Sequence, residues 1–262
     1  MFKIFSLLKF GGKGDPRRAP HAHPRRGLRY IRLQVEDLAS RQLGTAKSGS
    51  DVVRGVMAVY ELAQGLTDEQ TRDAPSEAVA CQVGCNHCCH LRVDTTPVEV
   101  VALASWLNEG RSAERVSELW RQVAETDDRT NGLTDEARAA ARIACPLLSD
   151  GRCSAYEMRP LDCRGFESPN VEICMALSRN PGNLDLLLSR HRYQVLLRAR
   201  LGLQAASRDL GLEYQTVELT AALRIALDIP DAAERWASGE VLFEGARWNS
   251  PPTTAPSPTG GR

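Results

Sequence analysis

Eight cysteines are the residues of this chain whose type and spacing point most directly to chemistry. All lie within residues 81–174 of the 262: Cys81, Cys85, Cys88, Cys89, Cys145, Cys153, Cys163 and Cys174. Thiolate sulfur binds zinc and holds iron–sulfur clusters. Such clustering in a reducing compartment indicates metal or redox chemistry rather than disulfides, and eight in one stretch are too many for buried small hydrophobes. We predict that these eight residues form a metal site.

The first group of cysteines has the spacing Cys81-x3-Cys85-x2-Cys88-Cys89. A continuous helix would spread it over about 12 Å along the axis, too far for one zinc ion, which holds sulfur at about 2.3 Å. We therefore expect a turn at Gly84 and a metal-binding knuckle at Cys85 and Cys88. Adjacent Cys88 and Cys89 tend to point in different directions. Either they serve two metal centres, or one of them remains a hydrogen-bond donor or a reactive thiol.

A second group follows, with the looser spacing Cys145-x7-Cys153-x9-Cys163-x10-Cys174. This spacing does not identify a metal, but positive charge accompanies it at Arg159 and Arg164. A nearby cation lowers the pKa of a thiol and stabilises a thiolate cluster. We expect Arg164 to support the bound centre and Arg159, together with Tyr156, to support the loop. Histidines beside cysteine ligands often donate hydrogen bonds to sulfur, so His87 and His90 are not part of the predicted ligand set.

The two groups together resemble the YkgJ-type cysteine-cluster proteins, which carry zinc- or iron-chelating domains. The resemblance rests on a CxxCxxCC-like cluster followed, in order, by Cys145-Pro-Leu-Leu, Cys153-Ser-Ala-Tyr156-Glu-x-Arg159-Pro160, Cys163-Arg164-x-Phe166 and Cys174. It covers about residues 81–180. The chain departs from the family pattern in having Cys81-x3-Cys85 where two residues usually intervene. The resemblance implies an intracellular metal-binding domain, and a related bacterial flagellin lysine methylase carries a similar cluster.

Several functions remain open for such a domain. The first candidate is a structural zinc module that presents a helical surface to a protein partner. The others are a metal carrier or sensor, and an iron–sulfur protein active in redox or methyl-transfer chemistry. The spacing Cys81-x3-Cys85-x2-Cys88 also matches radical S-adenosylmethionine enzymes, but these resemble partial α/β barrels, whereas helical patterns dominate here. The chain has no GxSxG, GxxxxGK[ST] or GxGxxG motif. The sequence therefore predicts a metal-binding protein and identifies no catalytic residue. It does not distinguish a zinc site from an iron–sulfur cluster.

The elements that must position these cysteines are mainly helical, with one short β-hairpin. Thr96, Pro97 and Glu99 form a capping box that predicts a helix running to Asn108. A helix after Thr134, carrying residues 137–144, is expected to deliver Cys145 at its C-terminal end. Residues 145–156 read as a hairpin in which Gly151 supplies the positive φ of a tight turn, so Cys145 and Cys153 are expected to lie close together.

Apolar spacing at i, i+3, i+4 and i+7 predicts further helices on both sides of the cysteines. The stripes expected to face the core are Ile31, Val35 and Leu38; Val52, Val56, Val59, Tyr60 and Ala63; Val116, Leu119, Trp120 and Val123; Leu184, Leu187, Leu188, His191 and Val195; and Val217, Ala221 and Ile225. The expected organisation is a basic disordered arm at 1–27, N-terminal helices at 28–80, a cysteine-cluster metal-binding domain at 81–180, C-terminal helices at 181–246 and a disordered tail at 247–262.

Charge and composition narrow the class of protein. The chain carries 33 Lys and Arg against 33 Asp and Glu, and 42% of its residues are apolar. These values indicate a soluble globular protein and argue against nucleic-acid binding. No apolar run reaches the roughly 18 to 20 residues of a membrane span, and no signal peptide is recognised at the N-terminus. We therefore expect a cytoplasmic protein, whose basic arm, with Phe2, Phe5 and Leu8, is either solvated or in weak contact with anionic lipid.

Overall fold

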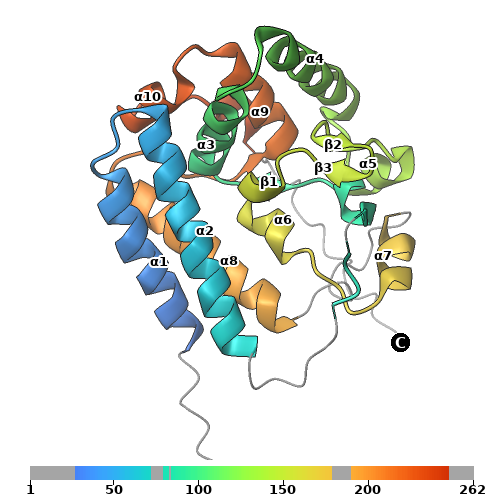
Figure 1. Ribbon diagram of the computed structural model, residues 1–262, viewed down its shortest axis with the longest axis horizontal. Helices are drawn as coiled ribbons and strands as arrows, with labels where there is room; N and C mark the ends of the chain where they lie inside the picture. Colours follow the sequence, from blue (N-terminus) through green and yellow to red (C-terminus); the bar gives the residue numbers. More distant parts are fainter. Residues whose placement is uncertain (1–26, 72–78, 83, 179–189, 248–262) are drawn as a thin grey trace, which may run out of the picture.

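The computed structural model describes residues 27–71, 79–82, 84–178 and 190–247 and is mainly helical (Figure 1). The α-helices are α1 (Leu28–Leu43), α2 (Gly49–Thr71), α3 (Pro97–Asn108), α4 (Ala113–Thr130), α5 (Asp135–Ala141), α6 (Leu161–Gly165), α7 (Val171–Leu177), α8 (Arg190–Asp209), α9 (Leu219–Asp228) and α10 (Ala232–Ala237). The strands are β1 (Asp94–Thr95), β2 (Leu148–Ser149), β3 (Arg152–Cys153) and β4 (Val217–Glu218), and 3₁₀ helices are η1 (His87–His90), η2 (Tyr156–Met158) and η4 (Glu244–Ala246). The predicted fold class, mainly α with a short hairpin, is confirmed.

The core lies between helices from both ends of the chain. Helix α8 packs on α1 and α2, α3 packs on α2 and α9, and the short α6 packs on α8 (Figure 1). Val35, Val56, Leu103, Leu203 and Trp236 are fully buried members of one apolar cluster. The helices before and after the cysteines therefore share one core, and the cysteine-bearing loops lie at one side of it, with α5 and α7.

Gly202 sets the close approach of α8 to α1. A Cβ atom at this position would lie 2.5 Å from the Arg32 carbonyl oxygen and 3.0 Å from the Val35 Cβ. We expect Gly202→Ala to lower the free energy of unfolding by about 2 kcal/mol, because the two helix backbones must separate. Gly65→Ala is the matched control, since nothing lies within 4 Å of a Cβ at this position of α2. It should stabilise by about 0.5 to 1 kcal/mol. Urea unfolding of both variants tests this, and equal effects would contradict it.

Two local predictions are confirmed in detail. Helix α3 begins at Pro97 with a complete capping box, in which the Thr96 side chain accepts from the Glu99 backbone and the Glu99 side chain accepts from the Thr96 backbone. Strands β2 and β3 form the expected hairpin, with Leu148 opposite Cys153. Asp150 and Gly151 both have positive φ, as a two-residue turn of type I′ requires.

Three local predictions are wrong. Helix α5 ends at Ala141 because Arg142 adopts the left-handed conformation, so Cys145 lies in the following loop and not at the helix end. Val217 belongs to β4, which pairs with β1, and not to the helix that follows. Trp120 is 42% exposed, because its indole lies at the edge of α4 and donates to the Asp228 carboxylate. The β1–β4 pair was not predicted, since two residues per strand give no alternation to detect.

Some predictions fall on residues that the structure does not describe. These are most of the basic arm and the C-terminal tail, the stripe at Leu184, Leu187 and Leu188, and the His191 side chain. Within the described ranges, none of the helices is both long enough and apolar enough to span a membrane.

Candidate metal centre

The first cysteine loop turns where the sequence predicts it. Gly84 has a φ of +91°, and the Cys85 N–H donates to the Gln82 carbonyl at 2.9 Å. The chain then enters η1, where the Cys89 N–H donates to the Asn86 carbonyl at 3.0 Å. The backbone turns before Cys85. As a result, Cys81 and Cys88 line the same hollow and do not follow one another along a helix.

The second group meets the first through the backbone. The Cys145 N–H donates to the Cys89 carbonyl at 2.7 Å, and the β2–β3 hairpin then brings Cys153 back beside the loop. Cys163 lies in α6 and Cys174 in α7. In the described residues, cysteines that are distant in sequence thus come from loops and short helices on the same side of the core.

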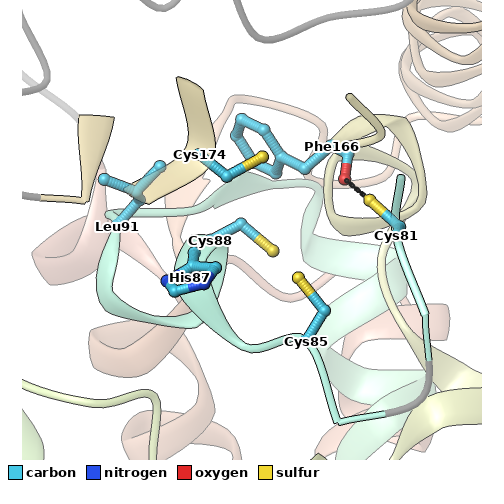
Figure 2. Close-up of a pocket in the computed structure, with 7 residues that line it drawn as sticks. All are labelled: Cys81, Cys85, His87, Cys88, Leu91, Phe166 and Cys174. Carbon is cyan, nitrogen blue, oxygen red and sulfur yellow. Dashed lines mark hydrogen bonds between the residues drawn. The ribbon is translucent and has the colours of Figure 1, made fainter. Parts of the chain in front are cut away.

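Four cysteines line one small hollow. Figure 2 shows Cys81, Cys85, Cys88 and Cys174 around it, with the sulfur atoms of Cys85 and Cys88 facing each other. His87, Leu91 and Phe166 complete the lining. The hollow has a volume of about 20 Å³, which is close to the space of one water molecule. It therefore suits an ion and not an organic substrate.

The other three cysteines of the second group lie deeper. Cys145, Cys153 and Cys163 are half-buried and pack against the main apolar core. Burial, together with the charge of Cys153, raises the pKa of the Cys145 thiol to about 12. Burial, and then the charges of Cys145 and Cys88, raise the pKa of Cys163.

Residues 80–180 match the model of the CxxCxxCC family, described as "Putative zinc- or iron-chelating domain". This segment belongs to that family. The match covers less than half of the chain, and it confirms the resemblance to a cysteine-cluster family seen in the sequence. Comparison of the chain with curated proteins and with solved structures gave no match. The family match therefore supports metal chelation by the CxxCxxCC segment and says nothing of the helices outside it.

The donors of the CxxCxxCC segment fit a soft metal in their chemistry but are not yet gathered around a point. All eight cysteines are free thiols, which zinc and iron–sulfur clusters both accept as thiolates. Across the described ranges, no three His, Cys, Asp or Glu side chains are arranged so that they hold an ion. A bound metal must therefore draw the sulfur atoms together.

Arg159 supplies positive charge to the thiols. The side-chain hydrogen bond between Cys88 and Cys89, together with burial, raises the pKa of Cys88, whereas the charge of Arg159 lowers it. Burial raises the pKa of Cys153, and Arg159 again acts in the opposite direction. The Arg159 Nε is buried and has no hydrogen-bond partner, and its guanidinium lies 3.9 Å from the centroid of the exposed Tyr156 ring. A positive charge beside thiols favours the thiolate form that an anionic metal centre uses.

Arg164 contacts an aromatic ring and the loop that carries Arg159. Its guanidinium lies 4.3 Å from the centroid of the Tyr60 ring, and its Nε donates to the Arg159 carbonyl at 2.8 Å. It therefore fixes the loop that carries Arg159. His87 lines the hollow, and His90 places Nδ1 3.2 Å from the Asn86 carbonyl oxygen.

The sequence did not single out Glu99 as a residue of the site. This fully buried carboxylate accepts from the Leu161 N–H at 2.7 Å and from the Tyr60 hydroxyl at 3.1 Å, besides closing the cap at Thr96. It thereby ties the start of α6, and with it Cys163, to α2 and α3. The capping motif was visible in the sequence, but nothing local indicates that the same carboxylate reaches a segment 62 residues away.

We expect Arg159→Gln to weaken zinc binding by about tenfold, because the variant removes the charge that favours the thiolates. Arg152→Gln is the control, since Arg152 lies exposed on the adjacent hairpin. Competition with a chelator of known affinity measures both constants. Equal affinity in the wild type and the Arg159 variant would contradict this role.

Proposed function

We propose that the CxxCxxCC segment is a thiolate metal centre and that zinc is its occupant. The observation that carries the proposal is the hollow of Figure 2, which Cys81, Cys85, Cys88 and Cys174 reach from the two ends of the segment. Zinc accepts four thiolates in structural sites. Iron–sulfur clusters are held by the same thiolate donors, so elemental analysis distinguishes the two occupants.

The residues around the thiols each serve such a centre. Leu91 and Phe166 limit the access of water to the hollow. Several thiolates on one divalent ion leave an excess of negative charge, which Arg159 offsets. When bound, the zinc ion supplies bonds that join loops otherwise connected by few hydrogen bonds. The function that follows is structural, with the metal holding α6, α7 and the hairpin in position. We place the protein in the cytoplasm, where thiols remain reduced.

Substitution of one cysteine from each group tests the proposal. We expect Cys85→Ser and Cys163→Ser each to lower the bound zinc per chain, because serine is a poor ligand for a soft ion. Zinc content after gel filtration in a reducing, anaerobic buffer is the measurement. Ser154→Ala, an exposed change beside Cys153, should retain the full content. Full retention in either cysteine variant would contradict a metal centre built from both groups.

A further inference from the structure

A groove between the helices, separate from the metal centre, carries an exposed tryptophan. It lies between the end of α3, the first half of α4 and the end of α9, and its volume is about 430 Å³. This volume is within the range of clefts that bind ligands, about 300 to 1,000 Å³. None of the residues that line the groove is a cysteine; they are Asn108, Ala113, Val116, Ser117, Trp120 and Leu227.

Trp120 presents an aromatic surface to this groove in a fixed orientation. Its indole Nε1 donates to the Asp228 carboxylate at 2.7 Å, which joins α4 to the end of α9 and leaves the ring available for stacking. Val116 and Leu227 add aliphatic wall, and polar groups of Asn108 and Ser117 lie at the groove. Aromatic-lined grooves of this kind accept proline-rich segments in the polyproline II conformation.

The chain supplies such a segment directly after the last described residue, Arg247. Residues 249–258 read NSPPTTAPSP, with prolines at four of the ten positions. This composition favours polyproline II, whose backbone carbonyls have no internal hydrogen bonds and are free to accept from other groups. Residues 248–262 contain no Asp or Glu, so the Asp228 carboxylate beside Trp120 does not repel them.

The position of Arg247 places the groove within reach of this segment. Arg247 pairs with Val217 just before α9, and η4 packs on α9. Helix α9 has ten residues and is therefore about 15 Å long, with the groove at its other end. Residues 248–258 span about 34 Å in polyproline II, at 3.1 Å per residue. The N-terminal helix α1, in contrast, begins on the far side of the molecule from α4 (Figure 1).

We propose that the proline-rich segment 249–258 docks in the Trp120 groove of its own chain as a polyproline II strand. Its prolines pack on the Trp120 ring and on the aliphatic wall, and Asn108 and Ser117 donate to its free carbonyls. Attachment through a few residues gives the segment an effective concentration in the millimolar range, so a weak contact is enough to hold it. The docked segment covers an apolar surface that is otherwise open to other chains.

Fluorine NMR of the full chain labelled with 5-fluorotryptophan tests the proposal. The signal of Trp120, one of four tryptophans, is the one that disappears in Trp120→Phe. The comparison is a full-length variant with Pro251→Ser, Pro252→Ser, Pro256→Ser and Pro258→Ser. We expect the Trp120 signal to shift in this variant and to broaden more strongly with a soluble paramagnetic agent. The signal of Trp236, which is fully buried in the core, should stay unchanged and report an intact fold. An unchanged Trp120 signal would overturn the proposal.

Dilution and an added peptide separate docking within one chain from the other occupants of the groove. The difference between the two proteins should not depend on protein concentration, and its loss on dilution would replace the chain's own segment by that of a second copy. A peptide of residues 248–262, added to the proline variant at about 1 mM, should move the Trp120 signal back toward its wild-type position. The same peptide with serine at the four proline positions should not, and equal effects of the two peptides would overturn recognition of polyproline II.

Discussion

Removal of the metal is expected to unfold the cysteine-bearing loops of the CxxCxxCC segment while the core helices stay folded. Helices α6 and α7 have five and seven residues, and the β2–β3 hairpin pairs two residues on each strand. Elements of this length are not stable alone. Structural zinc contributes roughly 10 kcal/mol or more to the folding of small domains at neutral pH, so its loss should dominate the local stability.

Hydrogen exchange measured by mass spectrometry checks this expectation. After chelation, amide protection in residues 84–91 and 145–177 should fall by an amount equivalent to about 4 kcal/mol or more. Protection in α2 and α8 should change little, because Val56 and Leu203 belong to the main core. The expectation is contradicted if metal removal is verified by elemental analysis and the cysteine loops keep their protection.

Glu99→Ala is expected to be the most damaging single substitution outside the cysteines. The change leaves the Leu161 N–H, the Tyr60 hydroxyl and the Thr96 backbone N–H without their acceptor, and all are buried. Each unsatisfied buried donor costs about 1 to 3 kcal/mol. Relaxation and water entry recover part of the sum, so we expect the free energy of unfolding to fall by about 4 kcal/mol.

Two milder variants separate the contacts of Glu99. Tyr60→Phe removes one hydrogen bond and should cost about 1 kcal/mol. Glu99→Gln keeps an acceptor for Leu161 and should have an intermediate effect. Chemical denaturation measures the stability of all three, and the zinc content per chain reports whether Cys163 is still positioned. A loss below 1 kcal/mol in Glu99→Ala would show that this carboxylate does not tie α6 to the bundle.

Local signals in the sequence were enough to predict several elements. The capping box at Thr96 and the Asp150-Gly151 turn satisfy backbone groups within four residues, so their chemistry can be recognised without the fold. The stripe from Val52 to Ala63 is buried as expected, because a long amphipathic helix has one face to bury. The clustering of the cysteines likewise indicated the family, which the match over residues 80–180 confirms.

Features that depend on distant partners were not predictable. Helix α5 ends at Ala141 because Arg142 adopts the left-handed conformation. Trp120 is exposed, and its indole donates to the distant Asp228 carboxylate. The contact of Arg164 with the Tyr60 ring joins segments about a hundred residues apart, which no local pattern indicates. Proximity in sequence to Cys163 suggested Arg164 as the cation beside the thiols. In the structure, the charge of Arg159 acts to lower the pKa of Cys88 and Cys153.

Elemental analysis of the anaerobically purified full chain tests the central claim most directly. Zinc, iron and acid-labile sulfide are measured on one sample, together with its absorption spectrum. We expect colourless protein with stoichiometric zinc. Iron and sulfide, with a broad absorption band near roughly 400 nm, would show that the same thiols hold an iron–sulfur cluster and not zinc. Folded, reduced protein that contains neither zinc nor iron, and takes up neither when supplied, would contradict a metal centre in this chain.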